Sequence, residues 1–305
     1  MRKLFLGLIL VLLGGILISL MHEKDWIIVH KNHIFMICDE KYAPYTATAI
    51  QSIEKNKSFF TKNYFYVAVP TDVEKVKLYF NENLTKNITF ISMSDFFKDR
   101  YDSSLMDVYY SRFWASELFP DLDKILYLDS DILVFKDLSA LYEQDIQNVY
   151  AGVVADHPGF AEKRMQELEL KTYFNAGVML LNLKKMRQDN ILQQLRSNYN
   201  LLKSNHKLQS ADQDVLNYTF KDRVKFLPRQ YNQLITVLPK ECNQEPIYIL
   251  HYTAYKPWGN NMVPFFMEYW DIFKKTHLSH YRQTQDKTVF DKHYIKVNEY
   301  FLKSF

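Results

Sequence analysis

Short runs of apolar residues alternate with stretches of helical periodicity from residue 33 onward, and this alternation limits the fold more than any other feature of the sequence. Six runs have the length of buried strands: 33–38, 64–69, 88–91, 125–128, 150–155 and 178–181. Helices are expected over 42–54, from 71 toward 83, and over 105–119 before Pro120. Strands separated by helices of this length indicate βαβ units. We therefore predict an α/β fold with a mostly parallel central sheet flanked by helices.

The domain organisation follows from length and composition. A chain of 305 residues with 48% apolar content can bury one large core, and it contains no internal repeat or low-complexity linker. We divide it into residues 1–30, an apolar segment with a short linker, residues 31–262, the α/β domain, and residues 263–305, a basic and aromatic helical extension.

The two ends of the chain suggest contact with a membrane. The apolar run 4–21 follows Arg2 and Lys3 and, as a helix, would reach about 27 Å, close to the thickness of a bilayer core. We predict a single N-terminal anchor, with a cleaved signal peptide and a buried core helix as alternatives. The predicted localisation is membrane-associated, on the cytoplasmic face in a bacterium and on the lumenal side in a eukaryote. Residues 274–305 carry seven Lys or Arg against three acids, as expected for a helix packed on the domain or touching anionic lipid.

Cysteine and glycine usage excludes several classes of site. Two cysteines, Cys38 and Cys242, exclude a disulfide scaffold and a thiolate zinc site. Only four of the seven glycines lie outside the N-terminal apolar run, and their positions exclude a dinucleotide fingerprint, a Walker A loop and a nucleophile elbow. A net charge of +3 gives no indication of nucleic-acid binding. A phosphorylated ligand would need its charge neutralised by something other than a glycine-rich loop.

Acidic residues follow three of the predicted strands. Asp39 follows the first strand, Asp129-Ser130-Asp131 the fourth and Asp156 the fifth. In parallel sheets the ligand binds beyond the carboxyl ends of the strands, so these side chains are expected at one edge of the sheet.

The triplet 129–131 has the pattern of a metal site. The chain contains two other Asp-x-Asp triplets, but 121–123 lies in a turn after Pro120 and 212–214 does not follow an apolar run. Asp129 and Asp131 project to one side of an extended segment, where two buried like charges are costly unless a cation binds them. Carboxylate oxygens suit Mg²⁺ or Mn²⁺, and such an ion can hold a diphosphate without a glycine-rich loop.

The segment around this triplet resembles family 8 glycosyltransferases, the group that includes bacterial lipopolysaccharide galactosyl- and glucosyltransferases and the glycogenins. The resemblance runs over about residues 33–260. It rests on six motifs in the family's order: Tyr110-Ser111-Arg112-Phe113, Lys124-Ile125-Leu126-Tyr127-Leu128-Asp129-Ser130-Asp131-Ile132-Leu133-Val134, Tyr173-Phe174-Asn175-Ala176-Gly177-Val178, Leu181-Asn182-Leu183, Asp212-Gln213-Asp214-Val215-Leu216-Asn217, and His251-Tyr252 with Lys256-Pro257-Trp258.

This resemblance implies a GT-A type nucleotide-sugar-binding fold for residues 31–262. It implies a retaining, Mn²⁺- or Mg²⁺-dependent transfer of galactose or glucose from a UDP-hexose to a glycan or glycolipid acceptor, such as a lipopolysaccharide core. The implied metal ligands are Asp129, Asp131 and His251. The residues implied to contact the donor or its metal are Cys38, Asp39, Tyr42, Arg112, Asp129, Ser130, Asn175, Ala176, Asp212, Gln213 and Lys256.

The resemblance leaves the route to retention open. If Gln213 lies below the anomeric carbon, its amide would be a poor nucleophile. This favours direct attack by the acceptor on the face of the sugar from which the phosphate departs. Asp212 is the catalytic candidate if a covalent intermediate forms.

Two other functions are compatible with parts of the sequence. A haloacid-dehalogenase-like phosphatase also places Asp-x-Asp after a strand, but Leu133 stands where such enzymes usually have Thr or Val. A catalytically inactive carbohydrate-binding relative would keep the fold without turnover. Against it, each aligned metal and phosphate position holds a chemically competent residue.

Overall fold

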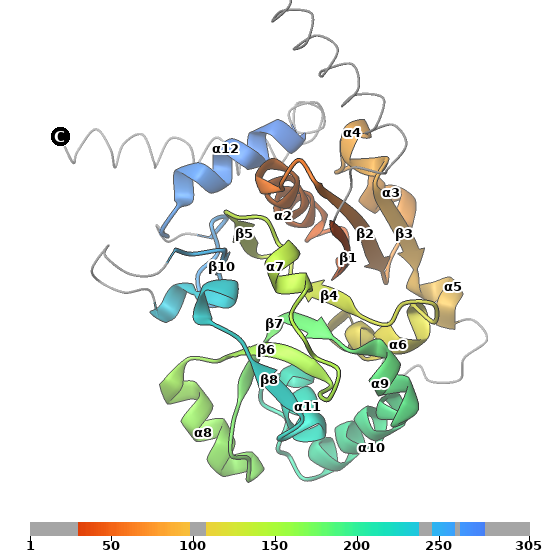
Figure 1. The fold of residues 1–305 in the computed structure, drawn as a ribbon, viewed down its shortest axis with the longest axis vertical. Coiled ribbons are helices and arrows are strands. Elements are labelled where there is room, and N and C mark those ends of the chain that lie inside the picture. The colour runs from red at the N-terminus through yellow and green to blue at the C-terminus, as the bar shows by residue number, and fades with distance from the viewer. Residues whose placement is uncertain (1–29, 98–107, 238–245, 260–262, 278–305) are drawn as a thin grey trace, which may run out of the picture.

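The structure is a computed structural model, and it describes residues 30–97, 108–237, 246–259 and 263–277 (Figure 1). Its strands are β1 (His30–Ile37), β2 (Thr61–Val69), β3 (Ile88–Ser92), β4 (Ile125–Leu128), β5 (Ile132–Val134), β6 (Ala151–Ala155), β7 (Phe174–Leu181), β8 (Val224–Phe226), β9 (Gln233–Leu234) and β10 (Ile249–His251).

Helices surround these strands (Figure 1). The α-helices are α2 (Ala43–Asn56), α3 (Val73–Lys77), α4 (Glu82–Thr85), α5 (Met93–Phe97), α6 (Ala115–Leu118), α7 (Ser139–Tyr142), α8 (Pro158–Leu168), α9 (Leu183–Gln188), α10 (Ile191–Ser204), α11 (Ala211–Phe220) and α12 (Phe266–His277). Three 3₁₀-helices complete the described elements: η2 (Val108–Trp114), η3 (Arg229–Asn232) and η4 (Ile235–Val237).

A seven-stranded sheet in the order β3-β2-β1-β4-β7-β6-β8 forms the centre of the molecule. β1 runs parallel to both β2 and β4, and β6 runs parallel to β8. β7 is antiparallel to its neighbours β4 and β6, so among the described strands of this sheet it alone is reversed. The predicted α/β fold with a mostly parallel sheet is confirmed.

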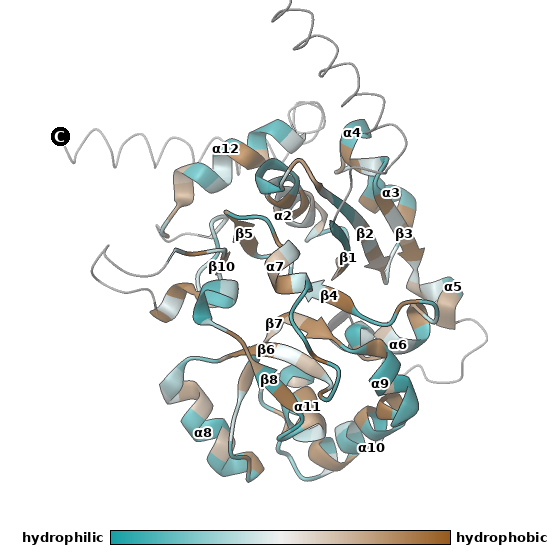
Figure 2. Cartoon of the chain, in the orientation of Figure 1, coloured by the Kyte–Doolittle hydropathy of each residue, from teal (hydrophilic) through white to brown (hydrophobic). Residues whose placement is uncertain are grey.

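Both faces of the sheet are buried, which explains the continuous apolar runs in the sequence. In β4, Ile125 and Tyr127 pack into one core cluster, whereas Leu126 and Leu128 pack into another on the opposite face. The helices instead alternate polar and apolar residues, as the mixed colours of α8 and α10 in Figure 2 show beside the brown β7. Their apolar residues face the protein interior, whereas their polar residues face solvent.

A second, three-stranded sheet in the order β5-β10-β9 lies beside the end of β4. β5 begins at Ile132, one residue after the Asp-x-Asp triplet, and pairs antiparallel with β10. α12 packs against α2 (Figure 1), and its Tyr269 and Phe273 join the apolar cluster that covers this small sheet. The small sheet therefore links the triplet to the C-terminal part of the described chain.

Some local predictions differ from the structure. The helix expected from 71 toward 83 is split into α3 and α4, and Asp72 caps α3 by accepting hydrogen bonds from the backbone N–H groups of Glu74 and Lys75. The helix expected over 105–119 is the 3₁₀-helix η2 followed by α6 in its described part. The first of these helices is interrupted because Asn81 starts a second one, its side chain accepting a hydrogen bond from the backbone N–H of Leu84.

The predicted membrane-associated localisation is corrected. Within residues 30–277, leaving out the gaps, no helix combines the length and apolar character that crossing a bilayer requires. The longest helices described, α2 and α10, have 14 residues each, which is shorter than the roughly 20 needed. The predicted N-terminal apolar helix (4–21) and the basic segment after residue 277 lie outside the described residues.

Candidate functional site

A cavity of about 860 Å³ lies at the carboxyl ends of β1, β4 and β6. Asp39, Asp129 and Asp156 line it, as expected from the strand-end rule. Reversed β7 begins at this same edge and brings Asn175, Ala176 and Gly177 into the cavity wall. All thirteen residues that the family resemblance implies as metal or donor contacts line this one cavity: Cys38, Asp39, Tyr42, Arg112, Asp129, Ser130, Asp131, Asn175, Ala176, Asp212, Gln213, His251 and Lys256.

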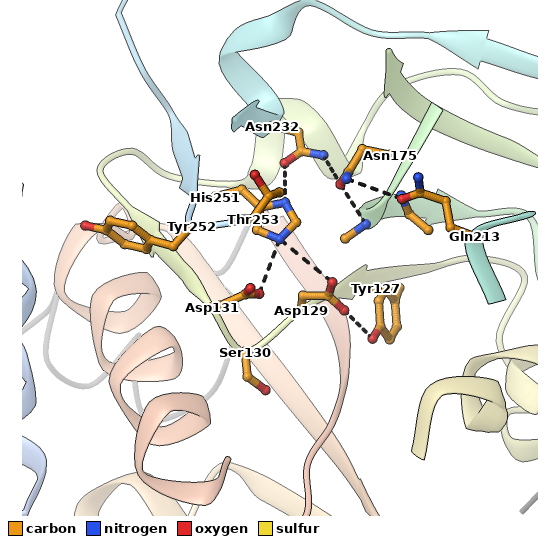
Figure 3. Close-up of polar contacts among 12 residues, drawn as sticks. Tyr127, Asp129, Ser130, Asp131, Asn175, Gln213, Asn232, His251, Tyr252 and Thr253 are labelled. Atoms are coloured by element: carbon orange, nitrogen blue, oxygen red, sulfur yellow. Dashed lines mark hydrogen bonds and ion pairs between the residues drawn. The ribbon is translucent and has the colours of Figure 1, made fainter. Parts of the chain in front are cut away.

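The small sheet brings His251 to the triplet. Ile132 of β5 pairs with His251 of β10, and the backbone N–H of Tyr252 donates to the carbonyl of Asp131 at 2.9 Å. His251 Nε2 lies 3.2 Å from Asp131 Oδ1 and 3.8 Å from Asp129 Oδ2 (Figure 3). One possible ligand atom from each of these three residues lies within 4.8 Å of the other two, so they can share one ion.

Two features of the structure fit a cation at this place. Gly177 leaves the necessary room, because a Cβ there would lie 2.1 Å from His251 Cε1 and 2.8 Å from Asp129 Oδ2. The Lys256 ammonium forms an ion pair with Asp131 Oδ2. Burial opposes ionisation of Asp131, but His251 and Lys256 outweigh it and hold the pKa of this carboxyl well below its usual range. A carboxylate that stays charged and attracts cations is suited to Mg²⁺ or Mn²⁺.

Arg112 ties the second carboxylate into the wall of the cavity. Its Nη2 donates to Asp129 Oδ1 at 3.1 Å, and its Nη1 donates to the carbonyl of Ala176 at 3.0 Å. Its Nε forms an ion pair at 3.1 Å with Asp212 Oδ2, and both side chains are buried. Burial raises the pKa of Asp212 to about 6 even though Arg112 lowers it. The guanidinium thus joins the triplet to the start of α11.

Gln213 is held by hydrogen bonds at both ends of its amide. Its Oε1 accepts from the backbone N–H of Ala176 at 3.0 Å and from Asn175 Nδ2 at 3.3 Å. Its Nε2 donates to Asp156 Oδ2 at 2.7 Å. The amide therefore has a defined orientation at the cavity wall (Figure 3).

Another part of the cavity wall comes from the end of β1 and the start of α2. Asp39 Oδ1 accepts from the backbone N–H of Tyr42 at 2.9 Å, and the Tyr42 ring is 40% exposed. Ser130 Oγ and Thr46 Oγ1 lie 2.7 Å apart. Burial raises the pKa of the Cys38 thiol to about 12, so this residue serves as an apolar part of the wall.

The third acid of the 212–214 triplet lies away from the cavity. Asp214 is fully buried and pairs with Arg164, and its Oδ2 accepts from the backbone N–H groups of Gln209 and Ser210 at 2.8 Å and 2.7 Å. These bonds hold the chain that leads into α11. Asp214 therefore stabilises the segment that positions Asp212 and Gln213.

The model for glycosyl transferase family 8 matches residues 33–262. The chain belongs to this family. A Haemophilus influenzae protein with a predicted glycosyltransferase activity is 32% identical over 250 residues, which are 72% of this chain and 70% of that protein. The lipopolysaccharide 1,2-glucosyltransferase of Escherichia coli K12 is 33% identical over 165 residues, 49% of this chain and 48% of that enzyme.

Solved structures of similar proteins show the same architecture. The galactosyltransferase LgtC, in complex with donor and acceptor sugar analogues, superposes with a TM-score of 0.67 at 25% identity, over 80% of this chain and 96% of that one. The GT-A type fold and the glycosyltransferase assignment are therefore confirmed. Neither the phosphatase nor the inactive relative is favoured by these similarities.

Two residues that bond to the candidate site residues were missed in the sequence. Tyr127 donates from its hydroxyl to Asp129 Oδ1 at 2.6 Å, and its ring packs 4.3 Å from the Arg112 guanidinium carbon. The sequence contains a signal for Tyr127, because it lies two residues before Asp129 and side chains two residues apart on a strand project from the same face. Asn232, beside His251, lies on the short helix η3 and has no comparable signal.

Proposed function

We propose that this family 8 member is a retaining, Mn²⁺-dependent hexosyltransferase. It transfers glucose or galactose from a UDP-hexose to a glycan or glycolipid acceptor, such as a lipopolysaccharide core. The observation that carries the proposal is the convergence of Asp129, Asp131 and His251 around a space that fits one divalent ion. The sugar classes are supported by the E. coli glucosyltransferase and the LgtC galactosyltransferase.

In this proposal Asp129, Asp131 and His251 hold the ion, and the bound ion neutralises the diphosphate of the donor. Asp39 and Tyr42 bind the uridine, and the exposed Tyr42 ring is available for stacking. Lys256 moves from Asp131 to the phosphates when the donor binds, and Arg112 orients Asp129 and Asp212. Fixed positive groups stabilise the charge that develops on a departing diphosphate.

We propose that the acceptor attacks the anomeric carbon on the same face of the sugar from which the diphosphate departs, so that the anomeric configuration is retained. The carbonyl oxygen of Gln213 already accepts from Asn175 and Ala176, so it is not free to act as a nucleophile. In this proposal the three residues together form the surface against which the sugar is oriented. Asp212 is paired with Arg112, which makes its carboxylate a weak nucleophile. We further propose residues 31–262 as the catalytic domain and 263–305 as an extension, of which α12 packs on α2.

The function is tested by following UDP release from UDP-glucose and UDP-galactose with Mn²⁺, because transferases slowly hydrolyse their donors without an acceptor. We expect release with at least one donor, none with EDTA, and none from Asp129→Ala or Asp131→Ala. Asp123→Ala is the matched control, since it alters an exposed Asp-x-Asp triplet outside the cavity. Wild-type activity in Asp129→Ala contradicts the proposal, as does phosphate release from simple monoesters or donor binding without turnover.

A further inference from the structure

Asn232 is fully buried between the metal-site histidine and the predicted sugar-binding residues (Figure 3). Its Nδ2 donates to Asn175 Oδ1 at 2.9 Å, and its Oδ1 lies 3.0 Å from His251 Nδ1. Asn175 in turn bonds to Gln213, so one chain of side-chain amides connects His251 with Gln213. The direction of each bond in this chain decides where the histidine carries its proton.

Backbone N–H groups set these directions, because they can only donate. The N–H of Gly177 points at Asn175 Oδ1 at 3.0 Å, which identifies this atom of the amide as the oxygen. In the same way, the N–H of Ala176 at 3.0 Å identifies Gln213 Oε1 as an oxygen. The orientations of both amides therefore follow from the hydrogen-bond network.

The assignment continues through Asn232 to the histidine. Because Asn175 Oδ1 can only accept, the Asn232 atom that faces it must be the NH₂ group. The carbonyl oxygen of Asn232 then faces His251 Nδ1, which must carry a proton to donate to it. His251 Nε2 points at Asp131 and Asp129, and it is the ring atom left to bind a metal ion.

We propose that Asn232 is a positioning residue that keeps a proton on His251 Nδ1 and thereby presents Nε2 to the divalent ion. This inference rests on the proposed function, since it assigns a role toward the ion of that site. The same amide binds Asn175, so it also fixes the metal ligand relative to the residues proposed to hold the sugar.

Binding of Mn²⁺ alone to the full chain, measured by titration calorimetry, tests this role. Asn232→Leu keeps the approximate volume but removes both bonds, and we expect affinity about 10- to 100-fold weaker. Asn232→Asp keeps an acceptor for the Nδ1 proton and loses the donor to Asn175, so we expect Mn²⁺ affinity close to that of the wild type. Asn32→Leu is the matched control for loss of a buried Asn, because Asn32 bonds Asn63 and Ser139 instead.

A second readout reports the proton itself. Nitrogen-15 spectra of histidine-labelled protein, with and without saturating Mg²⁺, should show His251 Nδ1 protonated in both conditions in the wild type. In Asn232→Leu without Mg²⁺ this preference should be lost, because no acceptor then faces Nδ1. A wild-type His251 with its Nδ1 unprotonated overturns the inference, and so does Asn232→Leu that binds Mn²⁺ as tightly as the wild type. A wild type that binds no Mn²⁺ overturns the proposed metal site instead, while the Nδ1 spectrum still decides the role of Asn232.

Discussion

At the scale of single residues, Gly177 shows how closely β7 approaches the metal site. Asp129 N–H donates to the carbonyl of Gly177 at 2.8 Å, so the two backbones are in direct contact. His251 packs over the same position. A residue with any side chain would occupy the space between the carboxylate and the imidazole, so a glycine is required here by volume.

We expect Gly177→Ala to weaken Mn²⁺ binding by at least about tenfold and to destabilise the fold by about 1–3 kcal/mol, because the added methyl group overlaps His251. Gly159→Ala is the matched control. A Cβ at Gly159 would lie 3.8 Å from His157 Cε1, an ordinary contact, and alanine favours the helix α8. Calorimetry with Mn²⁺ and urea unfolding measure both effects, and equal Mn²⁺ affinities of the two variants would contradict the geometry.

Asp212 predicts a dependence of stability on pH. Its pKa is raised to about 6 by burial, whereas the unfolded chain titrates near 3.9, so folding takes up a proton between these values. The stability contributed by the neutral carboxyl is complete below about pH 4 and is lost as the pH rises through about 6. Relative to Asp212→Asn, the wild type should lose about 2 kcal/mol of unfolding free energy between pH 4.5 and 7. Urea unfolding in EDTA measures this, and parallel curves for the two proteins would refute it.

At the scale of elements, the reversed direction of β7 completes the site. The parallel strands bring Asp39, Asp129 and Asp156 to one edge, and β7 starts at that edge with Asn175. A register shift between β6 and β7 at Val153 and Val154 lets the start of β7 depart from regular pairing. The apolar pattern of a strand contains no information on its direction, so the sequence placed Asn175 at the site only through the family resemblance.

The loop after β10 packs against the start of α2 through Trp258, which contacts the rings of Tyr42 and Tyr45. Trp258 stacks on Tyr45 with ring centroids 3.6 Å apart and an interplanar angle of 4°. Lys256 lies two residues earlier in this loop and reaches Asp131. We expect this stack to help position Lys256, whose ammonium also donates to the carbonyls of Tyr252 and Thr253.

We expect Trp258→Leu to weaken UDP binding in the presence of Mn²⁺ by about 3- to 10-fold, since an aromatic pair contributes about 0.5–1.5 kcal/mol beyond its buried area. Tyr255→Leu removes a 53% exposed aromatic ring from the same loop and should leave UDP affinity unchanged. Calorimetric titration with UDP compares the two. Equal losses in both variants, or none in either, would show that the stack does not position Lys256.

At the scale of the whole molecule, the sequence predicted the sheet and its acidic edge from physical rules alone. Asp129 and Asp131 were recognisable because they follow a buried strand directly. Asn232 was not, since its contact with His251 depends on how η3 packs beside β10, and no local pattern encodes that contact. The predicted membrane anchor rested on the apolar run 4–21 and on the basic residues before it, which lie outside the described residues. No helix in the described part of the chain is long and apolar enough to cross a bilayer.

The central claim is that one divalent ion joins Asp129, Asp131 and His251 to a donor diphosphate. Anomalous diffraction from crystals grown with MnCl₂ and UDP tests it directly. The account predicts a manganese peak within bonding distance of both carboxylates and of His251 Nε2, in contact with the UDP phosphates. Bound UDP with no manganese at these three side chains, or manganese bound elsewhere in the cavity, would contradict it.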